Sequence, residues 1–305
     1  MARTSTTFPP PHKIIREIVR TALSEDLSGG DITSNLLIEE RFQAQARIIA
    51  KQPMVLAGIL VAKETFHQVD QTLQVTLHAH DGKSVSKATP VITITGAARS
   101  LLQGERVALN FLQRLSGIST LTHRCCEAIK GNATILVDTR KTTPGLRILE
   151  KWAVRLGGGS NHRSSLHDGI LIKDNHLAIL AAHHIGITKA CLQAKAHAPH
   201  GLKICVEVET LHQVDQALQG KADVILLDNM SPEQVKKAIT KIHGRALTEV
   251  SGGITLDNIG AMAKAQPDFI SMGALTHSPR AMDFTMEISS RPTRRHLKAP
   301  QHSFR

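Results

Sequence analysis

Residues 157–176 read Gly-Gly-Gly-Ser-Asn-His-Arg-Ser-Ser-Leu-His-Asp-Gly-Ile-Leu-Ile-Lys-Asp-Asn-His, and this stretch indicates the architecture most clearly. Its apolar run, residues 169–172, has the length of a buried strand and ends abruptly at Lys173 and Asp174. Charged residues just past an apolar strand are typical of the catalytic mouth of a parallel barrel. The glycines would let backbone and side chains approach a ligand closely. We interpret the stretch as a loop and a strand that end at a functional site.

The same pattern recurs through the second half of the chain, where apolar strands alternate with amphipathic helices or loops. We predict that these strands end at Val137, Ile172, Val208, Leu227, Val250 and Ser271. This β–α repetition predicts a parallel α/β barrel. Polar groups follow these ends: Asp138-Thr139-Arg140-Lys141, Lys173-Asp174, Glu207 with Glu209, Asp228-Asn229, Ser251-Gly252-Gly253 and Gly273-Ala274. Because the C-terminal ends of barrel strands converge, we expect these groups on one rim.

The first half of the chain predicts a small α+β domain. An amphipathic helix over 12–24 precedes a solvated turn with a helix cap over 25–34. Strands are predicted at 45–50, 53–57, 73–79 and 90–95, with a helix at 59–69. A helical pattern then runs from Ala97 to Ile129, and we expect an interruption at Ser116-Gly117. Its polar face carries Arg106, Asn110 and Arg114.

Composition describes an ordinary soluble protein of 305 residues, with 41% hydrophobic and 21% charged residues. No apolar run approaches the roughly 20 residues of a membrane helix, and residues 1–13 lack the apolar core of a secretory signal. The four cysteines show no paired metal spacing, so we expect reduced thiols and a cytoplasmic location. We expect no membrane partner.

The net charge of +11 raises the question of nucleic-acid binding. Five of these charges lie in a basic tail over residues 291–305, for which we expect disorder. With no Tyr, one Trp and seven Phe, the chain is poor in the aromatic platforms on which bases stack. We therefore expect a small anionic substrate and no nucleic acid.

Three kinds of group are predicted on the rim of the barrel. The cations and a histidine form a cationic bowl of Arg140, Lys141, His162, Arg163 and Lys173, suited to carboxylate and phosphate groups. The carboxylates of Glu207 and Asp228 suit sugar hydroxyls, a divalent cation or positive charge in a transition state. The turns at 251–253 and 273–274 suit a phosphate at a helix N-terminus. Together they indicate a substrate with a phosphate, hydroxyls and further negative charge.

Several long motifs resemble one enzyme family, that of quinolinate phosphoribosyltransferase, the carboxylating nicotinate-nucleotide pyrophosphorylase. They are Glu-Asp-Leu-Ser-Gly-Gly-Asp-Ile-Thr, Asp-Thr-Arg-Lys-Thr-Thr-Pro-Gly, Gly-Gly-Gly-Ser-Asn-His-Arg, Leu-Ile-Lys-Asp-Asn-His, Val-Glu-Val-Glu, Leu-Leu-Asp-Asn, Ser-Gly-Gly-Ile and Gly-Ala-Leu-Thr-His-Ser, in the family's order from about Ile14 to Asp283. The resemblance implies an α/β protein with an N-terminal α/β sandwich domain over 1–118, completed by 278–305, and a C-terminal open α/β barrel over 119–277. It also implies a homodimer whose sites are completed across the interface.

The resemblance also implies a reaction and a set of residues. Quinolinate would react with phosphoribosyl pyrophosphate to give nicotinate mononucleotide, pyrophosphate and CO₂, with Mg²⁺ as cofactor. Arg140, His162, Arg163 and Lys173 would hold the two carboxylates of quinolinate, and Arg106 would reach into the neighbouring subunit's site. Lys141 and Lys173 would face phosphoribosyl pyrophosphate, and Glu207 and Asp228 would contact ribose hydroxyls and Mg²⁺. The remaining substrate-binding residues would be Thr139 and the phosphate-binding segments Ser251, Gly252, Gly253 and Met272, Gly273, Ala274.

The sequence departs from the family pattern at Ser164-Ser165, Val250 and Met272, none of which removes a charged group. Other functions stay open from the residues alone. Lys173 could form a Schiff base as in barrel aldolases. A related transferase could act on another aromatic acid, including one in molybdate-linked metabolism. A nucleic-acid binder would lose its retention on DNA with the tail. Histidines 162, 167 and 176 fit no compact zinc spacing, so we interpret them as polar lining or loop hydrogen bonding.

Overall fold

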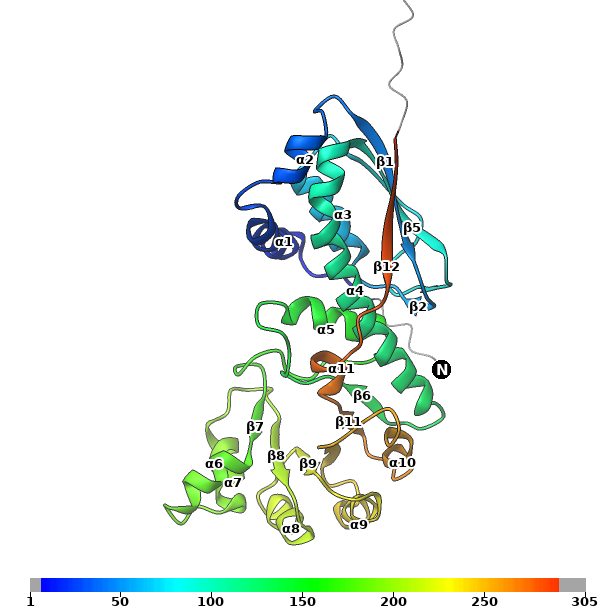
Figure 1. Cartoon of the computed structure of the whole chain (residues 1–305). Helices are drawn as coiled ribbons and strands as arrows, with labels where there is room; N and C mark the ends of the chain where they lie inside the picture. Colours follow the sequence, from blue (N-terminus) through cyan, green and yellow to red (C-terminus); the bar gives the residue numbers. More distant parts are fainter. Residues whose placement is uncertain (1–6, 291–305) are drawn as a thin grey trace, which may run out of the picture. The chain divides into compact units, whose positions relative to one another are not determined.

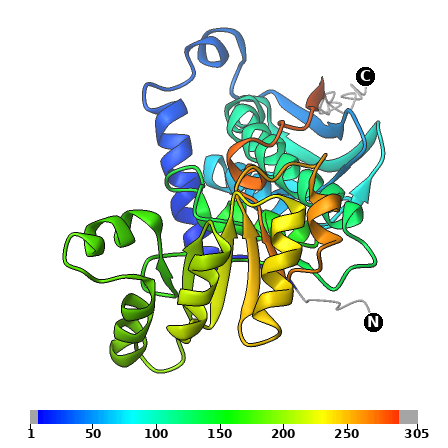
Figure 2. The same cartoon turned by 90° about the horizontal axis from the view of Figure 1, so that it is seen from below.

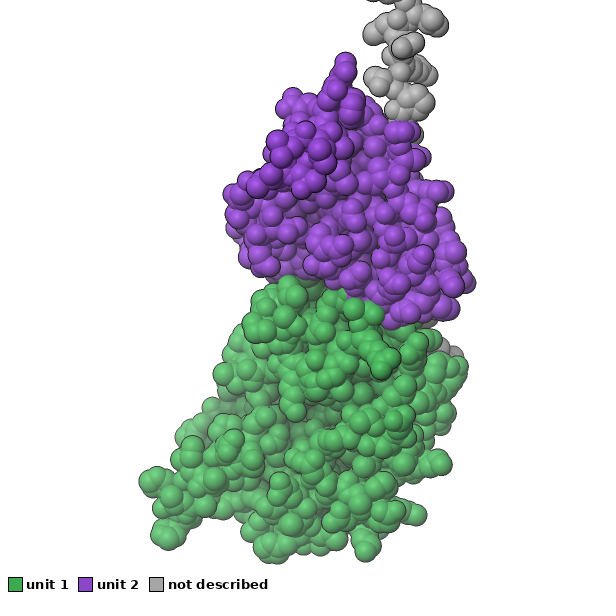
Figure 3. All heavy atoms as spheres, in the orientation of Figure 1, with its two compact units in different colours: residues 1–10, 55–57, 114–281 green, residues 11–54, 58–113, 282–305 purple. Residues whose placement is uncertain are grey.

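The computed structural model describes residues 7–290 and divides the chain into two compact units. Unit 1 comprises residues 1–10, 55–57 and 114–281, and unit 2 comprises residues 11–54, 58–113 and 282–305 (Figure 3). The expectation of disorder concerns the basic tail over residues 291–305, which lies outside the described residues. The domain boundaries expected from the resemblance, after residues 118 and 277, stay a prediction.

Unit 2 is built on a four-stranded antiparallel sheet with strand order β12-β1-β5-β3 (Figure 1). Helices α1 and α3 pack together on one face of this sheet (Figure 1). The strands of this sheet are β1 Gln43–Ala50, β3 Gln74–Leu77, β5 Thr89–Ala97 and β12 Phe284–Ser290. The short strands β2 Met54–Val55 and β4 Ser84–Val85 lie outside it. Its helices are α1 His12–Leu27, α2 Ile32–Leu37 and α3 Ile59–Val69. The predicted elements are thus present, although the strand predicted over 53–57 is only two residues long.

Local sequence explains these helices. In α1, Ile15, Val19 and Leu23 recur every four residues and are the buried positions, as amphipathic spacing requires. The predicted cap is confirmed at α2, where the Asp31 carboxylate accepts the backbone N–H of Ser34 at 2.9 Å.

The expected interruption of the long helix at Ser116-Gly117 is wrong, because α4 runs unbroken over Ala98–Ala128. The Ser116 hydroxyl donates to the carbonyl of Ala57 at 3.1 Å and accepts its N–H at 3.0 Å, so it does not compete with the helix backbone. Gly117 lets the carbonyl of Arg280 approach, where a Cβ would lie 2.3 Å from that oxygen. Ser116 and Gly117 therefore allow α4 to pack against other segments. Their helix-breaking tendency alone does not reveal this role.

Unit 1 contains a six-stranded parallel sheet with strand order β6-β11-β10-β9-β8-β7. The strands are β6 Ile135–Val137, β7 Ile170–Ile172, β8 Ile204–Val208, β9 Val224–Asp228, β10 Leu247–Ser251 and β11 Phe269–Ser271. Each ends within one residue of its predicted position. The edge strands β6 and β7 are not neighbours in the sheet, so the sheet is open. The fold class predicted from the sequence is confirmed.

Helices connect the parallel strands, as β–α–β units require. They are α5 Arg147–Leu156, α6 Asp174–Ala181, α7 Ile187–His197, α8 Leu211–Gln219, α9 Pro232–Ile242 and α10 Ile259–Ala263. Helix α11 Ala274–His277 follows the last parallel strand and precedes β12 in the chain. Helices α7, α8 and α9 lie side by side along the sheet (Figures 1 and 2). Thr210 and Ser231 cap the N-termini of α8 and α9 through capping boxes.

The strand register divides the side chains of the central strands into an apolar layer and a charged layer. Cys205 and Val224 stand level with each other, and Leu226 completes their buried cluster, with Leu171 and Leu247 packed against it. Side chains two residues apart on a strand share a face, so Glu207 and Glu249 lie on that same face. They are level with Leu226 and one step nearer the C-terminal ends than Cys205 and Val224. The apolar cluster thus forms a floor beneath charged groups at the rim.

Candidate functional site

Two carboxylates and a lysine meet at the ends of neighbouring strands. Lys173 follows β7, Glu207 lies near the end of β8 and Asp228 ends β9. The Lys173 Nζ lies 3.7 Å from the Glu207 Oε1. Burial raises the pKa of Glu207, Lys173 opposes this rise, and the nearby negative charge of Asp228 adds to it. The sequence prediction that these three groups share one rim is confirmed by the geometry.

The charges of Arg140 and Arg163 act on each other. Burial lowers the pKa of Arg163, and the positive charge of Arg140 lowers it further. Arg163 donates to the carbonyl of Gly169 at 2.9 Å. The Nε of Arg140 is buried and has no hydrogen-bond partner among the described residues. A buried donor without a partner is costly, so an acceptor supplied by a ligand would stabilise this side of the site.

His162 lies between Arg163 and a buried carboxylate. Its Nδ1 accepts the backbone N–H of Arg163 at 2.8 Å, which leaves the ring proton on Nε2. That Nε2 faces the Glu249 Oε2 at 3.4 Å, and the Glu249 side chain is only 5% exposed. The ring of His162 is therefore oriented by two contacts. Glu249 did not stand among the predicted site residues.

A buried ion pair lies directly beneath the bowl. Asp138 accepts hydrogen bonds from the Lys151 Nζ at 2.5 Å, the Asn161 side chain at 2.6 Å and the backbone N–H of His162 at 2.9 Å. Lys151 also donates to the carbonyl of His162 at 3.0 Å. Burial raises the pKa of Asp138 and lowers that of Lys151, and each charge opposes the shift of its partner.

A second buried carboxylate, Glu150, organises the loop that follows β6. It accepts from Arg114 at 2.9 Å and from the hydroxyl of Thr143 at 2.7 Å. The hydroxyl of Thr276 donates to the carbonyl of Lys141 at 2.7 Å, and the N–H of Lys141 donates to the hydroxyl of Thr139 at 3.1 Å. Arg114, predicted only on a polar helix face, thus supports the position of the loop that carries Thr139 to Lys141.

The turn after β10 has a backbone that requires glycine. Gly252 and Gly253 have φ of +86° and +61°, in the left-handed region. A Cβ on Gly252 would lie 2.2 Å from the side-chain oxygen of Asn229, which itself has a φ of +53°. The predicted segment Ser251 to Gly253 is therefore packed tightly against the end of β9.

The turn after β11 joins the same region. Met272 is buried and donates its N–H to the carbonyl of Val137 at 3.0 Å. Gly273 lies so close to Lys141 that a Cβ would come within 2.9 Å of that side chain, and Ala274 begins α11. The turns after β6 and β11 therefore meet, and the predicted segment Met272 to Ala274 adjoins Lys141.

The loop before β7 is held by its own hydrogen bonds. The Asp168 carboxylate accepts the backbone N–H groups of Ser164 at 2.6 Å and Ser165 at 3.0 Å. The Ser165 hydroxyl bonds to His167 at 2.9 Å, and the Nδ1 of His176 accepts the N–H of Lys173 at 3.0 Å. His167 thus forms a hydrogen bond within the loop, as interpreted from the sequence, whereas His176 lies in α6 and caps its first turn.

Arg106 is exposed on α4 and belongs to unit 2. The rim residues described above all belong to unit 1. Because the two units are placed independently, the predicted role of Arg106 stays a prediction.

The cysteines and the carboxylates limit the kinds of metal site. Burial raises the pKa of all four free thiols, to about 12 for Cys125, which fits inert packing groups. Within residues 7–290 there is no group of three or more His, Cys, Asp or Glu side chains placed to hold a metal ion. Glu207 and Asp228 together fit Mg²⁺ in the form in which one or two carboxylates and substrate phosphates share it.

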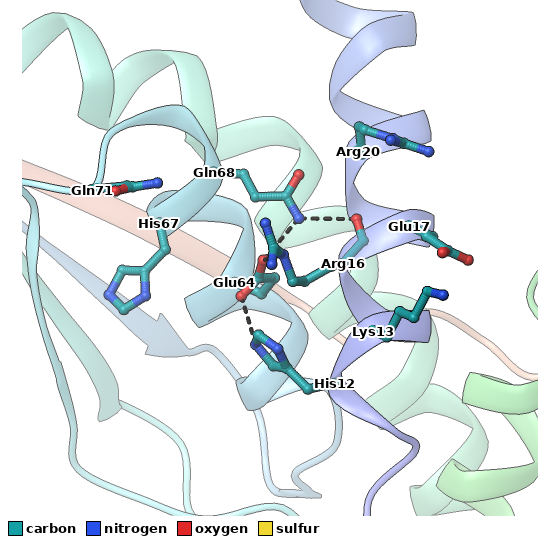
Figure 4. Close-up of a pocket in the computed structure, with 9 residues that line it drawn as sticks. All are labelled: His12, Lys13, Arg16, Glu17, Arg20, Glu64, His67, Gln68 and Gln71. Atoms are coloured by element: carbon teal, nitrogen blue, oxygen red, sulfur yellow. Dashed lines mark hydrogen bonds and ion pairs between the residues drawn. The ribbon is translucent and has the colours of Figure 1, made fainter.

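A cavity of about 830 Å³ lies in unit 2 between α1 and α3 and does not include the residues predicted as the site (Figure 4). Glu64 connects its walls by contacts to His12 at 3.0 Å and Arg16 at 3.6 Å. Lys13 and Arg20 point away from His67 and Gln71 in Figure 4, so the charges do not converge on one point. We interpret this cleft as a groove between two helices that Glu64 holds together.

The residues missed from the sequence are supporting groups, and one signal could have revealed two of them. Glu150 and Lys151 lie within the most buried part of α5, between Leu149 and Trp152. Charges in the apolar stretch of a helix are rarely buried unless they are paired. A search for such charges would have found both. Asn161 and Glu249 carry no comparable signal.

No helix among residues 7–290 is long and apolar enough to cross a membrane. Two family profiles match the chain. Residues 31–116 match "Quinolinate phosphoribosyl transferase, N-terminal domain", and residues 118–287 match "Quinolinate phosphoribosyl transferase, C-terminal domain".

Proteins similar over nearly the whole chain carry consistent names. A probable carboxylating nicotinate-nucleotide pyrophosphorylase of Bacillus subtilis is 41% identical over 278 residues, which cover 91% of this chain and 94% of the relative. The mitochondrial quinolinate phosphoribosyltransferase [decarboxylating] 2b of Nicotiana tabacum is 37% identical over 92% of this chain and 85% of its own length. The solved nicotinate-nucleotide pyrophosphorylase of Francisella tularensis superposes with a TM-score of 0.86 at 39% identity, covering 94% of this chain and all of the other.

Proposed function

This chain belongs to the quinolinate phosphoribosyltransferase family, and on that premise we propose how its residues divide the reaction between them. Its activity is that of a carboxylating nicotinate-nucleotide pyrophosphorylase of NAD biosynthesis. Quinolinate and phosphoribosyl pyrophosphate are converted to nicotinate mononucleotide, pyrophosphate and CO₂. The family typically uses Mg²⁺ with phosphoribosyl pyrophosphate.

Arg140 and Arg163 bind the adjacent carboxylates of quinolinate, with His162 and Lys173 beside them. One observation carries this assignment: among residues 7–290 the buried Nε of Arg140 has no hydrogen-bond partner, while its charge acts on that of Arg163. Two neighbouring positive charges repel each other. A ligand with two adjacent carboxylates neutralises that repulsion and supplies an acceptor for the Arg140 Nε–H. A planar guanidinium also matches a carboxylate in two parallel hydrogen bonds.

Phosphoribosyl pyrophosphate binds on the opposite part of the rim. Lys141 and Lys173 supply positive charge for its phosphates. The glycine turn at Ser251 to Gly253 and the segment Met272 to Ala274 bind the 5-phosphate, the second through the N–H groups of Gly273 and Ala274, since that of Met272 donates to Val137. Thr139 supports the neighbouring loop.

Glu207 and Asp228 contact the ribose hydroxyls and would hold Mg²⁺ together with substrate phosphates. The bound ion supplies charge neutralisation for the departing pyrophosphate. The two carboxylates favour the positive charge that develops at C1 of the ribose as the bond to pyrophosphate breaks. Burial strengthens this interaction because it removes screening water.

The chemical step requires position more than a protein nucleophile. The pyridine nitrogen donates its electron pair to C1 of the ribose, and pyrophosphate leaves with the electrons of the broken C–O bond. The ring is then cationic, so its 2-carboxylate can leave as CO₂ while the electrons of the C–C bond remain at C2, where a proton replaces it. The arginines hold the ring in line with C1 for the first of these steps.

The active form is a homodimer in which Arg106 of each subunit completes the neighbour's quinolinate site. The exposure of Arg106 on α4 supports this assignment, since its charge is available to another chain. We also propose a cytoplasmic location, which suits four free cysteines. Some relatives are named as mitochondrial or chloroplastic.

The test is product formation from quinolinate, phosphoribosyl pyrophosphate and Mg²⁺, followed as nicotinate mononucleotide and CO₂. Arg140→Ala and Lys173→Ala should each reduce kcat/KM at least about 100-fold, as expected for groups that orient substrates. The matched controls are Arg124→Ala and Lys236→Ala, exposed cations away from the rim, which should retain wild-type rates. Wild-type rates in the two rim variants would overturn the assignment. Turnover of another aromatic acid in place of quinolinate would overturn the substrate.

A further inference from the structure

The buried pair Asp138 and Lys151 contacts both segments that carry the arginines of the bowl. Asp138 directly follows β6, two residues before Arg140. Its carboxylate also binds the side chain of Asn161 at 2.6 Å and the N–H of His162 at 2.9 Å. Lys151, from α5, binds the carboxylate at 2.5 Å and the carbonyl of His162 at 3.0 Å. One ion pair thus joins the strand, the helix and the loop that precedes Arg163.

This pair is deeply buried and does not contact the reacting groups. The exposed fraction is 0% for the Asp138 side chain and 5% for that of Lys151. Removal of two charges from water is expensive, and apolar residues of similar size often give equal or greater stability at such positions. Stability alone is therefore a poor explanation for the pair. Its hydrogen bonds, all directed into the loop and α5, explain it better.

We propose that Asp138 and Lys151 are positioning residues that set the spacing of Arg140 and Arg163 for the two adjacent carboxylates of quinolinate. The proposal rests on the function assigned above. The geometric reason is the shortness of the connections. Only one residue separates Asp138 from Arg140, and Asn161 and Arg163 are equally close in sequence. A shift of the ion pair therefore moves one guanidinium relative to the other.

The experiment replaces both charges together as Asp138→Asn/Lys151→Met, which leaves no unpaired buried charge. The asparagine retains an acceptor for the N–H of His162, so the variant should fold. Inhibition is measured with phthalate, which has the two adjacent carboxylates on a benzene ring, and with benzoate, which has one. We expect the phthalate Ki and the quinolinate KM to rise at least about tenfold, with the benzoate Ki and the phosphoribosyl pyrophosphate KM within about twofold.

A merely structural role predicts a different pattern. It would change all four constants alike or change the thermal unfolding midpoint alone, and either result would overturn the proposal. The matched control is Asp215→Asn/Lys241→Met, the same substitutions in an ion pair between α8 and α9 whose side chains meet at 2.6 Å. This control should leave the ratio of phthalate to benzoate inhibition unchanged.

A second variant keeps the test decisive if the double variant does not fold. Asn161→Ala removes two hydrogen bonds at an exposed residue and creates no unpaired charge. It should raise the phthalate Ki severalfold, and a wild-type ratio of phthalate to benzoate inhibition would contradict the proposal. If instead Arg140→Ala and Arg163→Ala leave the phthalate Ki unchanged, the assignment of the bowl itself fails, and this outcome is distinct from a failure of positioning.

Discussion

The Lys173 Nζ lies 3.7 Å from the Glu207 Oε1, so a cation of the bowl contacts a carboxylate of the ribose side. The Lys173 side chain is 44% exposed and that of Glu207 is 18% exposed. The lysine therefore has a free, solvated approach to an anionic substrate while its partner is held at the end of β8. This contact links the two substrate regions, and it gives the first prediction.

The pH dependence of activity should report the ionisation of Glu207. Burial raises its pKa and Lys173 opposes that rise. A carboxyl with a raised pKa loses its charge at a higher pH than an ordinary glutamate, so kcat/KM should fall on the acid side above the usual glutamate range. Lys173→Met removes the opposing charge and should move this acid limb to higher pH. The wild type and Lys173→Met are assayed with the same substrates over the same pH range. If kcat/KM falls at the same acid pH in both, the prediction is contradicted.

The two glycines after β10 should differ in their tolerance of a side chain. Gly252→Ala places a Cβ 2.2 Å from the Asn229 oxygen at a φ of +86°, whereas a Cβ at Gly253 meets no atom within 4 Å. Gly253→Ala has only the left-handed backbone to accommodate, at about 1 kcal/mol. We expect Gly252→Ala to lose more stability and to raise the phosphoribosyl pyrophosphate KM at least about tenfold. Urea unfolding and steady-state kinetics on both variants check this, and equal effects would count against it.

Mixing of two inactive variants should restore activity if Arg106 acts across a dimer. Arg106→Ala and Lys173→Ala chains, each nearly inactive alone, would form mixed dimers after joint refolding. In such a dimer one site has both substitutions and the other has neither, so about a quarter of wild-type activity should return at equal mixing. The control mixes Arg140→Ala with Lys173→Ala, which lie on the same chain's rim and should not complement each other. Absence of recovery in the first mixture would exclude a shared site.

Asp81 should make the folded state less stable as the pH rises. Its carboxylate accepts the N–H of Ile59 at 2.9 Å at the start of α3, and burial raises its pKa from 3.8 to about 6. The folded chain thus binds this proton more tightly than the unfolded chain, so the free energy of unfolding falls as the pH rises from about 4 to about 6.

Asp81→Asn keeps an acceptor for Ile59 and removes the charge. It should stabilise the protein by about 3 kcal/mol at pH 8 and by nothing measurable at pH 4. Denaturant unfolding at the two pH values tests this. Asp26→Asn, an exposed carboxylate of the same unit, is the control. A variant that is less stable than wild type at pH 8 would show that the charged carboxylate is the better cap.

The alternation of apolar runs with polar strand ends was sufficient to predict the barrel. A parallel strand buried on both faces is a short apolar run, and in Ile170–Ile172 or Ile204–Val208 that run stops where the rim begins. The interruption predicted in α4 failed for the opposite reason. Ser116 and Gly117 break helices in isolation, yet here they contact the distant backbone of Ala57 and Arg280, which local propensity does not contain.

For the site, the sequence was enough to predict which charges share the rim, because the period of the strands and the direction of a parallel sheet place them there. It was not enough to predict that Asp138, expected on the rim with Thr139 to Lys141, is buried beneath it. Asp138, Lys151 and Glu249 are charged residues whose burial depends on partners that other strands, helices or loops supply. Whether a charge can leave water is decided by the hydrogen bonds that meet it after folding, and those exist only once strand, helix and loop have packed together.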